Sequence, residues 1–187
     1  MIRTAGIVFI SKGVSDKSHQ LVEEIHRKPE LPIAMHEAGQ AFAYEYHDIQ
    51  VDRCVLESPA PTVDGKSVQC GGITEPANRN EITKDNLWPE VVCIMAGAAA
   101  QHGVDELGAM DSAVRDMQRA AHFIEGVGLN PEQTDELIMA ASKAAVKIMK
   151  ENIAAVRKIA DVLEQKKRIE GYEIRKIIQQ SKEAARS

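Results

Sequence analysis

Apolar residues recur at three- and four-residue intervals through most of this chain, which is the spacing of one face of an α-helix. Residues 33–47 show this spacing first, and Pro32 before them suits a first helical turn. Four further helices are predicted from the same spacing and from capping residues: 86–102, 111–125, 131–167 and 172–184. Asp111 is the expected cap of the second of these, and Gly171 is expected to interrupt the pattern before the last.

Strand-like patterns occur only in the first part of the chain. Val51–Leu56 and Ser67–Thr74 have this character, and Asp64-Gly65 between them is a turn pair. Two antiparallel strands are therefore expected beside the helix over 33–47. The sequence predicts one mainly helical α+β domain over residues 1–187, in which residues 1–28 form an N-terminal extension.

Composition and charge narrow the class of protein. The 187 residues are 44% hydrophobic and 27% charged, which is typical of a soluble chain. A net charge of -5 argues against a broad nucleic-acid-binding face. Because no apolar run is long enough to cross a bilayer and no targeting segment is evident, we expect a cytoplasmic protein without a membrane partner. The three cysteines form no CxxC pair, so reduced thiols are expected.

One segment matches a phosphate-binding motif, the P-loop, in the form in which alanine replaces the first glycine. Ala60–Ser67 has the spacing of a P-loop, in which backbone amides and the start of a following helix converge on phosphate. The residues that follow, 68–74, are predicted to form a strand, and Pro61 removes one amide from the loop. We therefore expect no nucleotide here.

The segment His36-Glu37-Ala38-Gly39-Gln40 carries the most informative chemistry. On a helix, His36 and Gln40 share a face, and Glu37 lies beside them. The segment differs by one residue from HExxH, in which two histidines bind zinc and the glutamate acts as a general base. The alternative interpretation is an ordinary helix with a hydrogen-bonded core histidine and an exposed glutamate.

The residues around this segment resemble the peptidase domain of FtsH-type AAA zinc metalloproteases. Ile33–Gly39 is similar to the zinc helix of that family, and Ala96–Ala100 is similar to its Ala/Gly-rich helix. Asp116–Ala120 resembles the family's pattern around an aspartate ligand of zinc. The resemblance covers approximately residues 31–178 in one consistent order. It implies an FtsH-like fold with a small antiparallel sheet beside the HExxH-type helix and a C-terminal helical part.

The resemblance also implies a cofactor and a set of site residues. Zinc would be held by His36 and Asp116, with Gln40 as a weak or lost ligand, and Glu37 would be the catalytic base. An unfolded peptide segment would lie extended along an edge strand, against Val68, Cys70, Gly71, Gly72 and Ile73.

An independent argument supports Asp116. Its helical neighbours Ala113, Ala120 and Phe123 are apolar, and a buried carboxylate needs a compensating partner. The alternative partner of this carboxylate is Arg115 or Arg119.

The sequence departs from the family in ways that affect function. Gln40 replaces the second histidine ligand, Gln101 replaces a glutamate, and we expect neither an AAA module nor a membrane anchor. His47 lies about 16 Å along the helix axis from His36, too far to replace the missing ligand. His102, His122 and Cys70 lie on other elements, where the sequence does not place them relative to His36.

Two functions follow from these features. One is a stand-alone zinc metallopeptidase that hydrolyses peptide bonds with metal-activated water. The other is an inactive pseudopeptidase that binds peptides or a partner. The apolar positions within Met139–Ile159 indicate a helix partner inside the domain or a second subunit.

Overall fold

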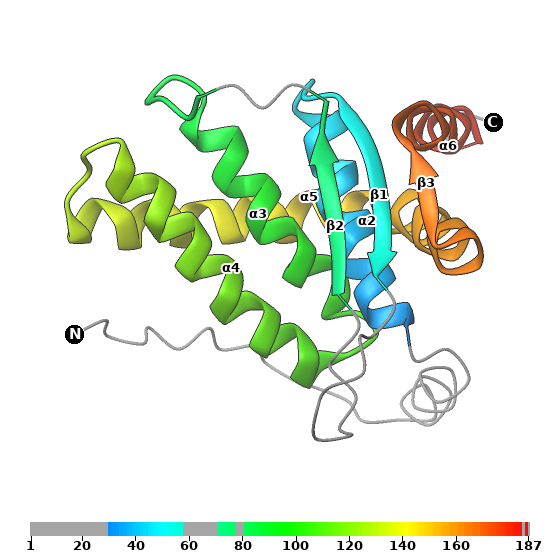
Figure 1. The fold of residues 1–187 in the computed structure, drawn as a ribbon, viewed down its shortest axis with the longest axis horizontal. Coiled ribbons are helices and arrows are strands. Elements are labelled where there is room, and N and C mark those ends of the chain that lie inside the picture. Colours follow the sequence, from blue (N-terminus) through cyan, green and yellow to red (C-terminus); the bar gives the residue numbers. More distant parts are fainter. Residues whose placement is uncertain (1–29, 58–70, 78–80, 185, 187) are drawn as a thin grey trace.

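The computed structural model of this chain describes residues 30–57, 71–77, 81–184 and 186 (Figure 1). Three predictions from the sequence lie outside these residues: the N-terminal extension over 1–28, the P-loop-like segment over 60–67, and the first half of the strand over 67–74.

The described residues form a mainly helical α+β arrangement, as the sequence predicts. The helices are α2 (Leu31–Tyr46), α3 (Leu87–Gln101), α4 (Glu106–Gly126), α5 (Pro131–Lys166) and α6 (Gly171–Ala184). The strands are β1 (Val51–Glu57), β2 (Gly71–Pro76) and β3 (Arg168–Glu170). No helix in the described part of the chain has the length and apolarity needed to cross a lipid bilayer.

The small sheet has the strand order β2-β1-β3, and both strand pairs are antiparallel. Its register places Cys54 opposite Thr74 and Leu56 opposite Gly72. Cys54, Leu56 and Thr74 are buried, because this face of the sheet packs on α2. β2 is therefore an edge strand that lies directly over the helix that carries His36 (Figure 1).

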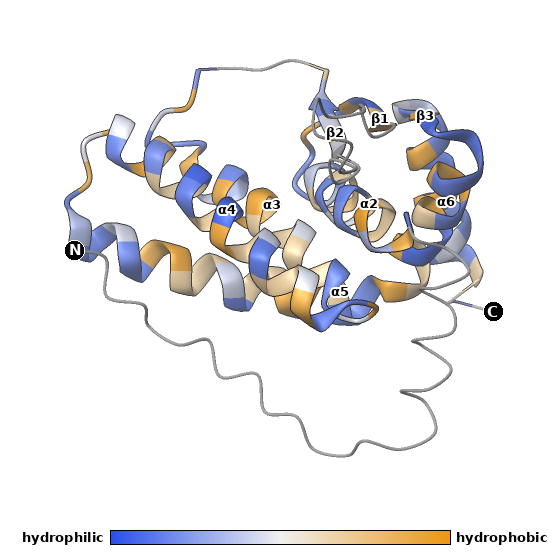
Figure 2. Ribbon diagram, turned by 60° about the horizontal axis from the view of Figure 1, so that its bottom comes forward, coloured by the Kyte–Doolittle hydropathy of each residue, from blue (hydrophilic) through white to orange (hydrophobic). Residues whose placement is uncertain are grey.

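Helix α3 lies between α2 and α4 and contacts both of them (Figure 2). It is apolar on most of its surface, which is typical of a helix that is surrounded by others. A glycine allows α2 and α3 to approach each other closely. A Cβ atom at Gly39 would lie 2.7 Å from the carbonyl oxygen of Ala96 and 2.5 Å from the Cβ of Ala100.

Helix α5 begins as predicted. Asn130 Oδ1 accepts a hydrogen bond from the Gln133 amide at 2.9 Å, and Gln133 Oε1 accepts one from the Asn130 amide at 3.1 Å. This reciprocal capping box satisfies two amides that the helix itself leaves unpaired. Ile148 and Val156 of α5 are buried against the rest of the domain, whereas Ile153 is 44% exposed. The apolar face of α5 thus has partner helices inside the domain, namely α2 and α3.

Helix α4 begins earlier than the sequence analysis predicts. Its cap is Asp105, whose Oδ1 accepts a hydrogen bond from the Gly108 amide at 2.9 Å, and Asp111 is an exposed residue within the helix. The expected cap at Asp111 is therefore wrong. Gly108 concealed the true start, because glycine is unfavourable inside helices. Here a Cβ would overlap the Asp105 carboxylate.

Strand β3 was not predicted, because it has only three residues and its pattern is too short to detect. Lys167 turns the chain into this strand with a φ of 62°, and its carbonyl oxygen accepts a hydrogen bond from the Leu56 amide at 2.8 Å. Gly171 is the first residue of α6, one residue before the predicted start of the last helix. Its missing side chain is required because the carbonyl oxygen of Val51 occupies the space of a Cβ.

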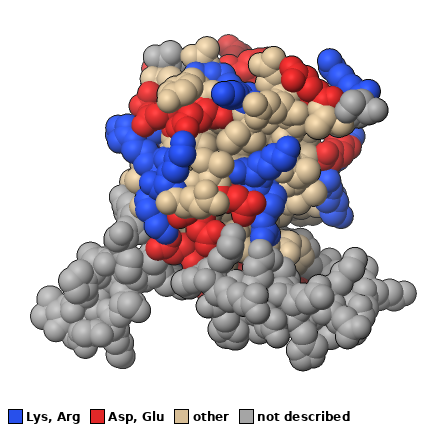
Figure 3. Space-filling view, turned by 90° about the vertical axis from the view of Figure 1, so that its right-hand side faces the viewer, with Lys and Arg blue, Asp and Glu red and all other residues tan. Residues whose placement is uncertain are grey.

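Basic and acidic side chains are interspersed on the face of the molecule that carries α6 and β3 (Figure 3). Several of them pair. Arg175 of α6 donates to Glu45 of α2 at 2.8 Å, and Lys166 donates to Glu173 at 2.5 Å. The first of these pairs joins the C-terminal helix to α2, but exposed pairs of this kind contribute little to stability.

Candidate functional site

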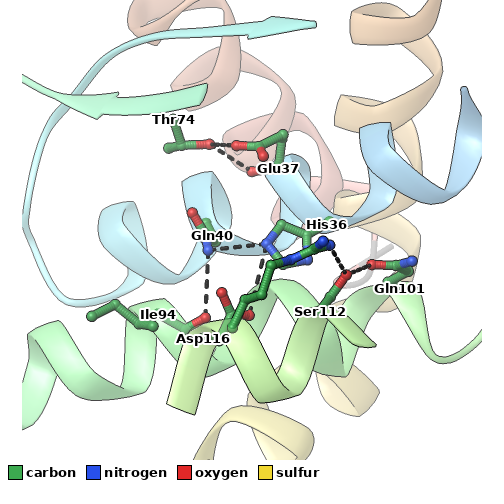
Figure 4. Close-up of polar contacts among 9 residues, drawn as sticks. His36, Glu37, Gln40, Thr74, Ile94, Gln101, Ser112 and Asp116 are labelled. Atoms are coloured by element: carbon green, nitrogen blue, oxygen red, sulfur yellow. Dashed lines mark hydrogen bonds and ion pairs between the residues drawn. The ribbon is translucent and has the colours of Figure 1, made fainter. Parts of the chain in front are cut away.

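His36 and Gln40 lie one turn apart on α2 and contact each other. The amide nitrogen of Gln40 lies 3.2 Å from His36 Nε2 and 3.4 Å from the carbonyl oxygen of Ile94 (Figure 4). An amide nitrogen can only donate, so the imidazole accepts this hydrogen bond at Nε2. Gln40 therefore occupies the ring nitrogen that a metal ion would need.

Asp116 reaches the same point from α4. Its Oδ2 lies 3.7 Å from His36 Nε2. Two ligands of a tetrahedral zinc ion, each about 2.0–2.2 Å from it, are separated by about 3.4 Å. The role of these residues as zinc ligands stays a prediction, but their spacing is compatible with it.

The alternative partners of Asp116 point elsewhere. Arg115 donates to the Ser112 hydroxyl at 3.4 Å, and the guanidinium of Arg119 lies 6.0 Å from the centre of the Phe123 ring. In the part of the chain that the structure describes, neither arginine forms an ion pair with Asp116. Asp116 Oδ2 is buried and has no hydrogen-bond partner there.

Burial shifts the pKa values of the two residues in opposite directions. Desolvation raises the pKa of Asp116 to about 7; the Arg119 charge opposes this shift and the Glu37 charge adds to it. Desolvation also lowers the pKa of His36 to about 4, and the charges of Arg115 and Arg119 act in the same direction. Between about pH 4 and pH 7, both side chains are therefore largely uncharged. A cation between them would stabilise the charged carboxylate of Asp116 and so offset the desolvation penalty on it.

Glu37 faces the sheet from the adjacent position on α2. Its Oε2 accepts a hydrogen bond of 2.8 Å from the hydroxyl of Thr74 in β2 (Figure 4). A Cβ atom at Gly72 would lie 2.3 Å from Glu37 Cγ, so this part of β2 packs directly on the glutamate side chain. Glu37 is only 6% exposed, which differs from the exposed glutamate of an ordinary amphipathic helix.

The imidazole of His36 packs on the backbone of α3. A Cβ atom at Gly97 would lie only 2.5 Å from His36 Nε2, so this position leaves no room for a side chain. Gly97 belongs to the Ala/Gly-rich segment over 96–100, and its role follows from this contact. Gly97 was not among the predicted site residues.

A buried polar network joins α3 to α4 close to His36. The Ser112 hydroxyl donates to Gln101 Oε1 at 2.9 Å (Figure 4). Gln101 Nε2 in turn donates to Asp105 Oδ2 at 3.4 Å. Gln101 is thus a structural link between the helices that carry Asp116 and Gly97. Ser112 and Thr74 were missed because an isolated hydroxyl residue forms no motif. The strand period could have indicated Thr74, since it places that residue on the buried face.

The predicted peptide-binding residues are partly described. Gly71, Gly72 and Ile73 lie on edge strand β2, and the side chain of Ile73 is 41% exposed. Val68 and Cys70 lie outside the described residues.

The remaining metal-ligand candidates lie at the ends of helices. His47 and His102 follow the last residues of α2 and α3, and His122 lies in the last two turns of α4. Among the described residues, no group of three or more His, Cys, Asp or Glu side chains is arranged to hold a metal ion.

The donor set that converges here is one imidazole, one carboxylate and one amide. The first two fit a zinc ion in type and spacing, and the buried Oδ2 of Asp116 lacks a partner. Gln40 fits only if its amide turns so that the oxygen rather than the nitrogen faces His36. An amide oxygen is a weaker, neutral donor, so these three residues would bind zinc more weakly than two imidazoles and a carboxylate would.

No protein-family model matches this chain, and no curated protein matches its sequence. The interpretation of the site therefore depends on the residues and their geometry alone.

Proposed function

We propose that this chain is a peptide-binding protein with an FtsH-like peptidase site that Gln40 has weakened, so that it hydrolyses peptide bonds poorly or not at all. The observation that carries the proposal is the meeting of His36 and Asp116 at 3.7 Å with the Gln40 amide against His36 Nε2. An imidazole and a carboxylate, which are two of the ligand types of zinc, remain. The position of the missing histidine holds Gln40, whose amide donates a hydrogen bond to the imidazole of His36.

A metal ion in this site would be held by His36 Nε2 and Asp116 Oδ2. When bound, it would supply a Lewis acid that lowers the pKa of a coordinated water. Glu37 is the residue that would take a proton, since it is adjacent to His36 and its charge acts on Asp116. Loss of one imidazole weakens metal binding, and the chemistry available to Glu37 declines with it.

Strand β2 offers the surface for a peptide. Because β2 is the edge of the sheet, its outer backbone groups can pair with an added extended segment. Ile73 presents an apolar side chain beside that edge, and Thr74 connects the strand to Glu37. An unfolded segment added here would lie next to the His36–Asp116 pair.

An active zinc metallopeptidase is the second candidate, and the burial of Glu37 next to this pair favours it. A glutamate of this kind carries a desolvation cost that a purely structural helix avoids. Such an enzyme would act on short or already unfolded segments.

Zinc titration by calorimetry, combined with a cleavage assay on an unfolded labelled protein, separates the two candidates. We expect weak zinc binding by the wild-type chain, about tenfold or more tighter binding after Gln40→His, and no cleavage that depends on Glu37 in the wild type. Tight zinc binding with cleavage that Glu37→Gln abolishes would establish the active enzyme instead. If Gln40→His gains no zinc affinity, the helix is not a zinc helix and the proposal fails.

Peptide binding is tested by fluorescence anisotropy with a labelled unfolded peptide. Ile73→Asp should weaken binding at least tenfold, because it places a charge beside the edge that the peptide would cover. Ile153→Asp is the matched control, since Ile153 on α5 is 44% exposed and Ile73 is 41% exposed. Equal effects of the two substitutions would rule out β2 as the binding edge.

A further inference from the structure

The hydroxyl of Thr74 is the centre of a small buried network between the sheet and α2. Thr74 Oγ1 lies 2.8 Å from Glu37 Oε2, 3.1 Å from the Glu37 carbonyl oxygen and 3.2 Å from Cys54 Sγ. A hydroxyl has one proton to donate, and the shortest contact is with the carboxylate oxygen. Thr74 therefore donates to the Glu37 carboxylate and can accept from one other group.

Cys54 is the group that donates to Thr74. It lies directly opposite Thr74 in the sheet register and is fully buried. Burial raises the pKa of the Cys54 thiol, with a further contribution from the Glu37 charge, so the sulfur keeps its proton at neutral pH. The order of donation is then Cys54 to Thr74 to Glu37. Hydrogen bonds linked in this way strengthen one another.

Packing limits the Glu37 side chain from the same strand. The backbone of Gly72 lies against Glu37 Cγ and Cδ, where even a methyl group would come within 2.3 Å and 2.7 Å of these atoms. Gly72 and Thr74 both point to the α2 side of β2 because residues two apart on a strand share a face. β2 therefore contacts the glutamate by packing at one residue and by a hydrogen bond at the other.

We propose that Thr74, with Cys54 as its donor, is the positioning residue for Glu37 and fixes the direction of its carboxylate relative to the His36–Asp116 pair. The proposed base is thereby connected to the strand that would carry the peptide. The proposal rests on the proposed function in one respect, namely that Glu37 is the group that takes a proton.

Two substitutions distinguish positioning from a general contribution to packing. Thr74→Val has nearly the same shape but lacks the hydroxyl, and Thr74→Ser keeps the hydroxyl but loses a methyl group. Thr134→Val is the matched control, because Thr134 is also buried and its hydroxyl donates at 2.9 Å, but to the Asn130 carbonyl at the start of α5.

The first experiment measures the carboxyl ¹³C resonance of Glu37 in the metal-free full-length chain, identified by its loss in Glu37→Gln. Thr74→Val should shift this resonance, because a carboxylate oxygen loses its donor. Thr74→Ser should keep it near its wild-type position, and Thr134→Val should not move it. The proposal is overturned if Thr74→Val leaves the resonance in place or if Thr134→Val shifts it equally.

The second experiment measures steady-state hydrolysis of an unfolded peptide by Gln40→His loaded with zinc. Adding Thr74→Val should lower kcat about tenfold at unchanged KM and zinc affinity, since a misdirected base acts on the chemical step. Thr74→Ser in the same background should recover most of that loss. An unchanged kcat in a Thr74→Val chain that still hydrolyses would overturn the positioning role.

The two experiments fail separately. If Gln40→His binds zinc but hydrolyses nothing, the proposed role of Glu37 as the catalytic base is contradicted. The resonance of Glu37 in the metal-free chain still decides whether Thr74 directs the carboxylate.

Discussion

His36 and Asp116 are a buried acid–base pair in which both partners favour the uncharged form. The folded-state pKa of Asp116 is about 7, above its ordinary value of 3.8. The contribution of Asp116 to the free energy of unfolding therefore falls as pH rises from about 4 to 7. The folded-state pKa of His36 is about 4, below its ordinary value of 6.5, so stability is lost as pH falls through the same range. The two effects oppose each other in the wild-type chain.

Removing Asp116 should expose the effect of His36. In metal-free Asp116→Asn, we expect the free energy of unfolding to rise by up to about 3 kcal/mol between pH 4 and 6.5, because only the neutral imidazole tolerates burial. The wild-type chain should change much less over this range. Urea denaturation at several pH values with a chelator present provides the measurement.

The complementary variant has the opposite sign. In His36→Gln the Asp116 effect remains, so the free energy of unfolding should fall as pH rises from about 4 to 7. Slopes of the same sign in the two variants would contradict the assignment of these pKa shifts.

The residues of the site differ in how far the sequence predicts them. Helical spacing predicts that His36 and Gln40 share a face, and the apolar neighbours of Asp116 predict its burial, because both are local properties. The approach of Asp116 to His36 was expected only from the family resemblance. Gly97 lacks such a signal, and the strand period indicates only that Thr74 is buried, because the roles of both residues arise only when β2 and α3 pack on α2. A hydroxyl or a glycine acquires its function from the element that packs on it.

At the scale of elements, the close approach of α2 and α3 determines where His36 lies. Gly39→Ala would place a methyl group 2.7 Å from the Ala96 carbonyl oxygen, which neither helix can relieve without moving. We expect a loss of about 1–3 kcal/mol in the free energy of unfolding, measured by urea denaturation.

Gly126→Ala is the control for this prediction. Gly126 is the last residue of α4, and nothing lies within 4 Å of the position of its Cβ. Alanine there should be neutral or should stabilise the helix by up to about 1 kcal/mol. If both substitutions destabilise the chain equally, the contact between α2 and α3 is not tight at Gly39.

The elements themselves were predictable where they are long. The helical period located α2, α3 and α5, and the Asn130 capping box marked one boundary accurately. The start of α4 and the strand β3 could not be predicted in this way. Gly108 is required by the Asp105 carboxylate, and β3 exists only because β1 offers it a partner. Both features depend on residues that are brought together by folding.

At the scale of the whole molecule, the site joins two helices that have a third between them. His36 and Gln40 come from α2, Asp116 comes from α4, and α3 separates and contacts both. A zinc ion bound by these residues would connect α2 to α4 directly. Because the unfolded chain does not hold these residues together, zinc binding there would add its free energy to the stability of the fold.

Thermal unfolding should therefore report the affinity of the proposed zinc site without any assay of activity. A free zinc concentration one hundred times the Kd stabilises a folded protein by about 2.7 kcal/mol, which raises Tm by roughly 5–11 °C for a chain of this size. We expect such a rise for Gln40→His at a zinc concentration that moves the Tm of the wild-type chain by only about half as much, since tenfold weaker binding removes about 1.4 kcal/mol. A chelator should reverse both shifts, and Asp116→Ala in the Gln40→His background should abolish the rise. A rise that persists without Asp116 would place the metal elsewhere on the chain and contradict the joining of α2 to α4.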